Sequence, residues 1–347
     1  MAADRRLGCL SIFLFVALCA SLFVNFVLMA AVFQRYGGVR EIESLPRFRE
    51  ILLQRGTRGA DDKVVVITMR GLISSSIPGN VSDSMVDDMR TALQQAREDN
   101  RVKAIVLEID SPGGEVTASD AIYSALVKAR AKKPVVVYME SLAASGGYYV
   151  SCGGKFLMAS DTTITGSIGV IIQTLNYEQL FNKVGLASVV FKSGKFKDML
   201  SGDREPGEIT AEERAMVQAL IDETFEKFKS VVADGRKQAA KDNDGKGREL
   251  APDWKSYADG RVFSGRQAHQ LGFVDELGSF DTAFQRALDL GDVDDANLVQ
   301  YQLPVSFGRF FRLFGKSHAP TIKLDLGVEL PKITAGKMYF LSPTFLR

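Results

Sequence analysis

The sequence predicts an α/β protein built on a largely parallel sheet, and two observations carry this prediction. Apolar, β-rich runs at residues 64–69, 102–109 and 135–139 have the length and composition of buried strands. Between them lie two stretches, 84–98 and 116–131, in which apolar residues recur at helical spacing. Strands that alternate with helices in this way are typical of parallel sheets, because each crossover needs room for a helix.

Further elements are expected after the third strand. The segment from Thr210 to Arg236 has the pattern of a long amphipathic helix, and Thr210 is expected to cap it with Glu213 as the capping-box partner. Shorter elements are expected at four places: a helix opening at Ser145, strands at 156–159 and 164–172, and a helix at 265–271.

The start of the chain differs from the rest. Residues 7–33 contain no charged side chain, and about 20 apolar residues are enough to span a bilayer as a helix. Arg5 and Arg6 precede this run, and the apolar core of a cleaved secretory signal is shorter, at roughly 7–15 residues. We therefore predict an uncleaved signal anchor, with residues 1–6 cytoplasmic, a single pass through the cell (inner) membrane and the remainder extracytoplasmic. A cleaved signal peptide and a buried core helix are the alternatives.

The overall composition excludes several classes of function. The 347 residues are 46% hydrophobic and 24% charged, with a net charge of +1 and no basic stripe, so we expect no nucleic-acid partner. Two of the three cysteines, Cys9 and Cys19, fall in the apolar run, and Cys152 alone cannot form a disulfide framework. The sequence shows neither metal-ligand spacing nor a phosphate-binding loop, so we expect no metal and no other cofactor.

Three further regions follow the apolar run. Residues 34–62 are polar and mixed in charge, and we expect a stalk that is partly helical around residues 40–53. Residues 63–290 carry the pattern of the globular domain. Residues 291–347 form a C-terminal extension of no assigned role. Its apolar segment 338–346 has a strand-like composition, and one hypothesis is that it pairs as an extended peptide against a neighbour's groove.

Two glycine-rich loops follow predicted strands, where α/β proteins usually place their active sites. The first is the segment 111–114, with sequence Ser-Pro-Gly-Gly, and the second is the turn at Ser145. Glycine lets backbone N–H groups approach a ligand, and a helix N-terminus favours negative charge. If the loops are neighbours, the N–H groups near Gly114 and of Gly146 would form an oxyanion hole beside a Ser145 nucleophile. A tight turn that needs small residues is the alternative for either loop alone.

A serine nucleophile also needs a base. The two histidines, His269 and His318, lie outside any pattern that suggests a triad. A lysine amine can take the role if burial lowers its pKa. Three candidates follow the apolar run at 189–191, and composition does not choose among Lys192, Lys195 and Lys197.

These motifs together resemble those of the SppA-type signal peptide peptidases, in their short, single-copy form. The resemblance covers roughly residues 63–290 and makes this region the peptidase domain. In the family's lysine motif the lysine before aspartate is the base, which is Lys197 here, 52 positions after Ser145. The matching segments are 143–149 for the nucleophile, 111–114 for the oxyanion loop, 165–170 for a further motif, 193–198 for the lysine, and 259–265 with 271–275 for the closing segment.

The resemblance implies a Ser–Lys dyad on a Clp-protease/crotonase-like fold with repeated strand–helix units. Ser145 would attack the peptide carbonyl and Lys197 would take its proton. Ser167 would orient Lys197, while the N–H groups of Gly114 and Gly146 would hold the oxyanion.

The resemblance also implies partners and substrates. The family forms ring-like homo-oligomers in which neighbouring protomers can complete each other's dyad, and it degrades remnant signal peptides and other apolar, membrane-associated peptides. Two alternatives use the same fold: a crotonase-like acyl-CoA enzyme, since that fold also uses Gly-Gly oxyanion loops, and a non-catalytic membrane scaffold.

Overall fold

The computed structural model of the chain describes residues 15–28, 48–57, 61–75, 84–243, 245–303 and 339–341. The chain divides into two units, Met1–Pro46 and Arg47–Arg347. In the first, residues 15–28 form a helix with exposed side chains. Within the described ranges, no helix is both long and apolar enough to cross a bilayer. The rest of the predicted 7–33 anchor lies outside those ranges.

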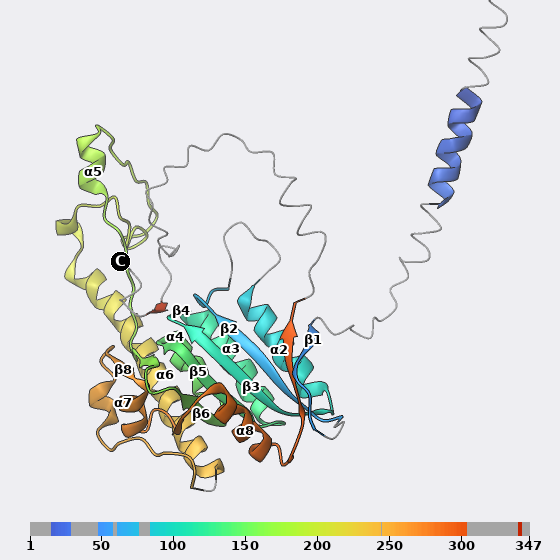
Figure 1. The fold of residues 1–347 in the computed structure, drawn as a ribbon. Coiled ribbons are helices and arrows are strands. Elements are labelled where there is room, and N and C mark those ends of the chain that lie inside the picture. The colour runs from blue at the N-terminus through green and yellow to red at the C-terminus, as the bar shows by residue number, and fades with distance from the viewer. Residues whose placement is uncertain are drawn as a thin grey trace, which may run out of the picture. The chain divides into compact units, whose positions relative to one another are not determined.

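Nine of the described strands form one sheet in the second unit, and its central strands run parallel (Figure 1). The order is β1-β10-β2-β3-β5-β6-β9, with β7 paired to β5 and β8 paired to β7. The predicted largely parallel sheet is therefore confirmed. The bounds are β1 Arg49–Gln54, β2 Lys63–Arg70, β3 Val102–Ser111, β5 Val135–Ala144, β6 Phe156–Ala159, β7 Ile164–Gly166, β8 Val262–Ser264, β9 Glu276–Leu277 and β10 Asn297–Gln302.

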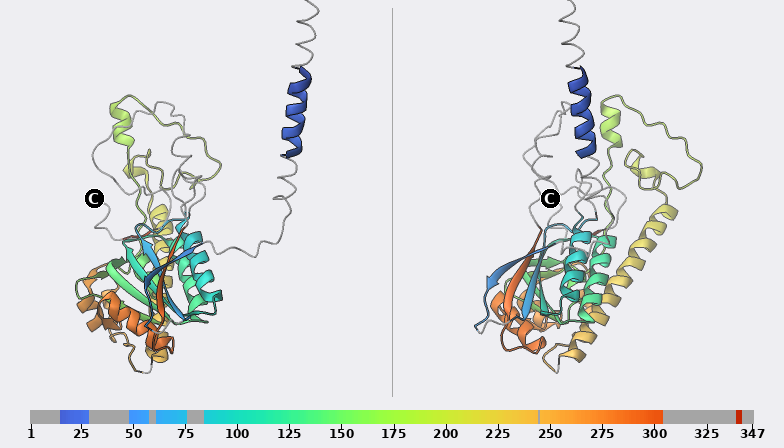
Figure 2. Two further views of the ribbon diagram at one scale, coloured as in Figure 1. Left: turned by 45° about the vertical axis from the view of Figure 1, so that its right-hand side comes forward. Right: turned by 90° about the vertical axis from the view of Figure 1, so that its right-hand side faces the viewer.

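Helices cover both faces of this sheet, because successive strand residues point to opposite faces. Val65 and Ile67 of β2 belong to the core shared with α2, α3, α4 and α6, whereas Val64 and Val66 belong to the core shared with α8. Figure 2 shows α2 and α3 between the strands and α6. The helix bounds are α2 Met85–Glu98, α3 Val116–Arg130, α4 Gly146–Ser151, α5 Glu178–Lys183, α6 Ala211–Asp242, α7 Gly265–Gln270 and α8 Phe280–Leu290.

The long helix begins where the sequence predicts. The Glu213 N–H donates to Thr210 Oγ1 at 3.2 Å, and the Thr210 N–H donates to Glu213 Oε2 at 2.8 Å. These reciprocal bonds form the predicted capping box of α6. At the other end of α6 the buried Arg236 guanidinium pairs with the Asp275 carboxylate, which fixes the helix against the core.

Several expectations are wrong in detail. Over residues 49–53 the expected stalk helix is instead strand β1, because this segment pairs antiparallel with β10. The sheet thus includes residues on both sides of the expected 63–290 boundaries. The strand expected over 164–172 ends at Gly166, since Gly166 and Ser167 both take positive φ, 82° and 52°, and turn the chain. The sequence reading also missed α8, which begins at the Ser279 cap.

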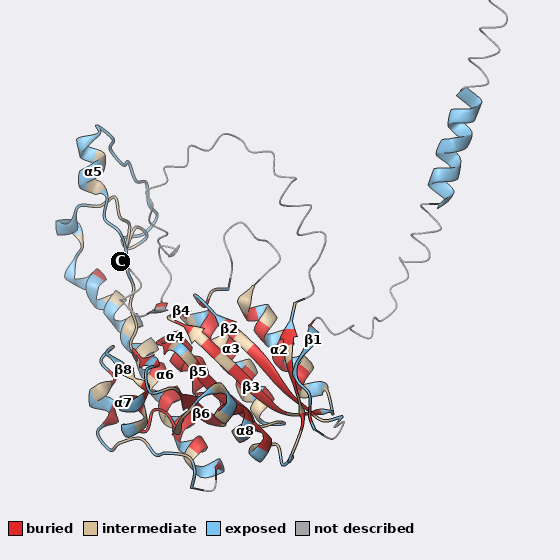
Figure 3. Cartoon of the chain, in the orientation of Figure 1, coloured by how far each residue is buried: buried red, intermediate tan, exposed pale blue. Residues whose placement is uncertain are grey.

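One segment of the second unit consists mostly of solvent-exposed residues. Residues 172–210, which we call the arm, carry α5 and are mostly pale blue in Figure 3, the colour of exposed residues. Large apolar side chains of the arm are exposed, with Phe191 at 95% and Leu175 at 79%. Others are exposed to a lesser degree: Leu180, Val184, Leu186, Val189 and Val190.

Candidate active site

Ser145 lies at a sharp strand-to-helix turn. Strand β5 ends at the preceding residue, and Ser145 is the N-cap of α4 with φ 53° and ψ −113°. A non-glycine residue with positive φ costs of order 1–3 kcal/mol, so the surrounding structure must impose it. Two hydrogen bonds do so: the Ser145 N–H donates to the Gly166 carbonyl at 2.8 Å, and the Tyr149 N–H donates to the Ser145 carbonyl at 2.8 Å. The strain is characteristic of a serine presented for nucleophilic attack.

The Ser145 hydroxyl is buried without a partner. The residue is 1% exposed, and within the described part of the chain its Oγ makes no hydrogen bond. Leaving a buried hydroxyl without a hydrogen bond costs about 1–3 kcal/mol, so the free Ser145 hydroxyl needs an explanation. A role in which this hydroxyl stays available for an incoming group would explain it.

The two glycine loops are neighbours, as the oxyanion-hole prediction requires. A Cβ placed on Gly146 would lie 3.1 Å from the Gly114 nitrogen and 3.2 Å from Gly113 Cα. Gly114 lies in a short strand, β4 (Gly113–Glu115), that begins just after β3 ends. Its backbone passes so close to Ile73 that a Cβ would lie 1.9 Å from the Ile73 carbonyl oxygen. Only glycine fits at this point.

Hydrogen bonds to Ile73 decide which way the Gly114 amide points. The Ile73 N–H donates to the Gly113 carbonyl, and the Glu115 N–H donates to the Ile73 carbonyl, both at 2.8 Å. Since successive residues of a strand direct their backbone groups to opposite edges, the Gly114 N–H points away from Ile73. The other edge of β4 therefore carries the candidate oxyanion donor.

Ser167 adjoins the same turn. Ala144 pairs with Gly166 across the parallel strands β5 and β7, so Ser145 and Ser167 are the next residues of adjacent strands. Ser167 is 3% exposed, and its N–H donates to the Arg261 carbonyl at 2.8 Å. Of the four described non-glycine residues with positive φ, two are Ser145 and Ser167.

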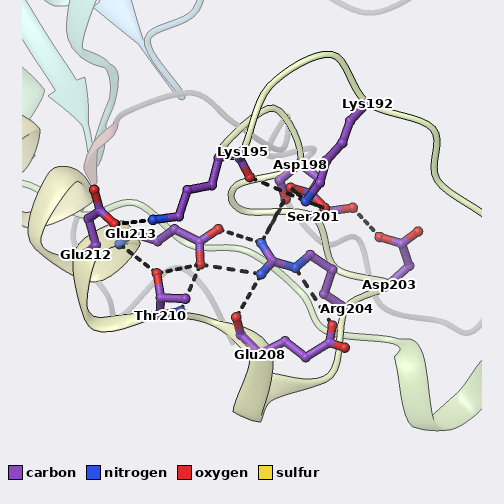
Figure 4. Close-up of polar contacts among 10 residues, drawn as sticks. All are labelled: Lys192, Lys195, Asp198, Ser201, Asp203, Arg204, Glu208, Thr210, Glu212 and Glu213. Carbon is purple, nitrogen blue, oxygen red and sulfur yellow. Dashed lines mark hydrogen bonds and ion pairs between the residues drawn. The ribbon is translucent and has the colours of Figure 1, made fainter.

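Lys197 is not brought to Ser145 in this chain. It lies in a turn of the arm, is exposed, and its side chain makes no hydrogen bond or ion pair to any part of the chain that the structure describes. The other two candidate lysines form ion pairs with carboxylates (Figure 4): Lys192 Nζ lies 2.8 Å from Asp198 Oδ1, and Lys195 Nζ lies 2.5 Å from Glu212 Oε2.

Of the two histidines, only His269 lies among the described residues. Its ring contacts the Arg248 guanidinium, and burial and that neighbouring charge lower its pKa. His318 lies outside the described residues.

A residue that the sequence reading missed ties the lysine-bearing turn to α6. Arg204 Nη1 lies 2.6 Å from Glu213 Oε1, and Arg204 Nη2 donates to the Glu208 carbonyl at 2.8 Å (Figure 4). The hydrogen bond from Arg204, with the backbone N–H of Thr210, lowers the pKa of Glu213 to about 2. Arg204 Nη1 also lies 3.8 Å from Asp198 Oδ1, so Arg204 joins the lysine-bearing turn to α6. The signal for it in the sequence is a cation among the acidic residues of the segment 198–213.

The C-terminal region contributes a strand beside this site. Strand β11 (Tyr339–Leu341) pairs antiparallel with β4, and Phe340 lies opposite Gly114. On the other side the N–H groups of Tyr339 and Ile171 each donate to the other's carbonyl at 3.1 Å. Residues 339–341 thus pair as an extended strand, as expected for part of the segment 338–346, and the groove that they occupy in this structure belongs to the same chain.

Comparisons with known proteins agree with this geometry. The model of peptidase family S49 matches residues 127–294, and the model of the Clp protease family matches residues 61–165. A putative protease of Synechocystis is 43% identical over 197 residues, which cover 57% of this chain and 66% of that protein. A putative signal peptide peptidase SppA of Enterococcus faecium is 33% identical over 247 residues, which cover 70% of this chain and 68% of that protein.

One further relative and one solved structure were also compared with the chain. Protease 4 of Salmonella typhi is 35% identical over 242 residues, so the match covers 69% of this chain and 36% of that protein. A solved structure of a membrane-bound stomatin-specific protease with a substrate peptide aligns at a TM-score of 0.42 and 17% identity, over 73% of this chain and 97% of that one. The fold is the mixed α/β, Clp-protease-like fold with a parallel-rich sheet. By the family match and the Enterococcus relative, the chain belongs to peptidase family S49, a family of serine peptidases.

Proposed function

We propose that this protein is a membrane-anchored serine endopeptidase with Ser145 as nucleophile and Lys197 as general base. One observation carries the proposal: the buried, unpartnered Ser145 hydroxyl at a strained turn, with the Gly114 and Gly146 backbones beside it. A strained serine, a free hydroxyl and nearby amide donors are the parts that acyl transfer requires.

The reaction follows from these parts. Ser145 Oγ attacks the carbonyl carbon of the substrate while the Lys197 amine takes the hydroxyl proton. The N–H groups of Gly114 and Gly146 stabilise the oxyanion, and one such donor is typically worth about 10²–10³ in rate. The Lys197 ammonium then gives a proton to the leaving amine, and water hydrolyses the acyl-enzyme by the same route. The Ser167 hydroxyl, next to Ser145, would orient the amine.

The ion pairs of the arm favour Lys197 over its neighbours as the base. A carboxylate next to an amine favours the charged form, which has no lone pair to accept a proton. Lys192 and Lys195 each form an ion pair with a carboxylate, and Lys197 forms no ion pair within the described residues.

The environment that desolvates the base is proposed to come from a second copy of the chain. Lys197 is exposed here, and an exposed apolar surface such as that around Phe191 and Leu180 marks an interaction site. A ring of identical subunits, each contact joining the arm of one copy to the peptidase site of the next, would cover that surface. It would also bring Lys197 of one copy to Ser145 of its neighbour.

The charge-free run at residues 7–33 supports the membrane anchor. An anchored enzyme with its domain outside the cytoplasm would meet apolar peptides at the membrane surface. Remnant signal peptides are the substrates that this arrangement suits best, in agreement with the name of the Enterococcus relative.

The test compares three variants with the wild type: Ser145→Ala, Lys197→Ala and, as a matched control from the same turn, Lys195→Ala. Labelling by a serine-reactive phosphonate and hydrolysis of an apolar fluorogenic peptide are measured, with circular dichroism to verify folding. We expect the first two variants to lose both activities and the control to keep them. Wild-type rates in Lys197→Ala would overturn the choice of base. A wild type that takes no phosphonate would favour a non-catalytic scaffold instead.

A further inference from the structure

The carboxylate of Asp198 directly follows the proposed base in the sequence. A carboxylate near an amine favours the charged ammonium form, which has no lone pair to accept a proton. The Asp198 side chain is only 13% exposed, so solvent screens its charge in part. Asp198 would therefore oppose the role of Lys197 unless its own charge were compensated.

Lys192 compensates this charge. Its Nζ lies 2.8 Å from each of the two carboxylate oxygens of Asp198, so both oxygens share one ammonium (Figure 4). The same ammonium donates to the Lys195 carbonyl at 3.3 Å, which ties it to the turn that also contains Lys197. The hydrogen bond from Lys192 lowers the pKa of Asp198, so this carboxylate stays ionised and paired at neutral pH.

Arg204 is the second cation at Asp198. Its Nη1 lies 3.8 Å from Asp198 Oδ1 and 3.5 Å from the Asp198 carbonyl oxygen. The same nitrogen lies 2.6 Å from Glu213 Oε1, and Glu213 belongs to the capping box of α6. Asp198 is thus held at the start of a long helix as well as by Lys192.

Most of the other charged side chains near this turn also have polar partners among the described residues. These contacts join Lys195 to Glu212, Asp203 to the hydroxyls of Ser188 and Ser201, and Glu208 to Arg204. Glu205 is exposed, and solvent weakens its effect on its neighbours. Of the three lysines in the segment 192–197, Lys197 is the one without a carboxylate partner in the described part of the chain.

We propose that Lys192 and Arg204 are positioning residues that hold the Asp198 carboxylate, so that the Lys197 amine remains free to accept the Ser145 proton. This role rests on the proposed function, because it takes Lys197 as the base. It adds two side chains to the machinery, and neither of them needs to touch the substrate.

The pH dependence of phosphonate labelling reports the state of the base. Only an unprotonated Lys197 can accept the Ser145 proton, so the labelling rate should rise with pH and level off above a midpoint. An unpaired carboxylate beside an amine moves such a midpoint upward, by about one pH unit. At a pH below the midpoint the rate then falls about tenfold, whereas the limiting rate at high pH stays the same.

Lys192→Met is the main test variant, because it removes the ammonium and keeps an unbranched side chain. Labelling of the full chain is measured from about pH 6 to about pH 10, with circular dichroism to verify folding. We expect the midpoint to rise by about one pH unit and to rise also in Arg204→Met. Lys195→Met is the matched control, since it breaks an ion pair of the same turn that does not involve Asp198, and it should keep the wild-type midpoint. A wild-type midpoint in Lys192→Met would overturn the proposal.

Two further variants separate the charge of Lys192 from its shape. Lys192→Met combined with Asp198→Asn removes both charges of the pair, so the midpoint should return close to that of the wild type. Lys192→Arg keeps the cation and should keep the midpoint as well. If the midpoint of the double variant stayed displaced, Lys192 would act through the conformation of the arm and the proposed role would be wrong.

Failure of the proposed function would look different. Wild-type labelling in Lys197→Ala would remove Lys197 as the base. Loss of labelling in Lys197→Ala, together with a wild-type midpoint in Lys192→Met, would keep the base and remove the role of Lys192 and Arg204. If the wild type takes no phosphonate, NMR of the ¹³C-lysine-labelled Ser145→Ala chain still measures the Lys197 midpoint, and an equal midpoint with and without Lys192→Met would count against that role.

Discussion

The buried ion pair between Arg236 and Asp275 gives a stability prediction whose size follows from the structure. Both side chains are fully buried, and Arg236 Nη1 lies 2.8 Å from Asp275 Oδ2. The Asp275 carboxylate also accepts hydrogen bonds from the N–H groups of Leu157 and Arg248, at 2.8 Å each, and Arg236 Nε donates to the Gly272 carbonyl at 2.9 Å. The pair is therefore fully satisfied and holds α6 to the core.

Asp275→Asn keeps the shape of the side chain and leaves the guanidinium buried without its counter-charge. Breaking a buried pair by removing one partner costs about 3–5 kcal/mol, a large fraction of a typical unfolding free energy of about 5–15 kcal/mol. For a domain of this size each kcal/mol lowers Tm by roughly 2–4 °C, so we expect a fall of about 10 °C.

Thermal unfolding followed by circular dichroism measures this fall, and a double variant isolates its cause. Arg236→Met with Asp275→Asn removes both charges, so it should be more stable than Asp275→Asn alone, with a coupling of about 1–3 kcal/mol. An Asp275→Asn protein within about 0.5 kcal/mol of the wild type, in the range of ordinary surface changes, would refute the reasoning.

Three further predictions concern the site, the arm and the core. Gly146→Ala places a Cβ 2.6 Å from the Ser119 hydroxyl and 3.1 Å from the Gly114 nitrogen, so the Gly114 loop must shift away from Ser145 and we expect phosphonate labelling to fall about 10²–10³-fold; an unchanged rate would count against the oxyanion role. Arg204 lowers the pKa of Glu213 from 4.5 to about 2, so ionised Glu213 stabilises the fold above about pH 4.5 and this contribution is lost as the pH falls toward 2. The difference in unfolding free energy between wild type and Glu213→Gln should shrink over that range, and a pH-independent difference would contradict the pairing. Burial raises the pKa of the Cys152 thiol to about 12, so in a chain with the other two cysteines replaced by serine, iodoacetamide should react only after unfolding, and rapid reaction of the native protein would disprove its burial.

Local signals account for the parts of the fold that the sequence predicts. The runs that became β2, β3 and β5 are buried on both faces, so their composition is apolar throughout and easy to recognise. The capping box of α6 depends on two residues three positions apart, and both are visible in the sequence. The adjacency of the Gly114 and Gly146 loops follows from the parallel order of β3 and β5.

Long-range pairing accounts for the parts that the sequence does not predict. Strands β1 and β10 lie about 240 positions apart in the chain, and β1 is exposed along its whole length, so it has no alternation of buried and exposed residues that would mark it as a strand. Strand β11 is placed by its pairing with β4 and Ile171, which both lie far from it in the sequence. The partner of Lys197 is harder still, since no described residue of the same chain supplies it.

The central claim is that Ser145 of one copy reacts with the help of Lys197 of another, and one mixing experiment tests it directly. The Ser145→Ala and Lys197→Ala chains, each inactive alone, are co-expressed in equal amounts and assayed for phosphonate labelling. In a ring of identical contacts, half of the sites keep Ser145 and half of their neighbours keep Lys197, so labelling should recover to about one quarter of the wild-type level. Labelling no higher than that of the separate variants would contradict a dyad shared between copies.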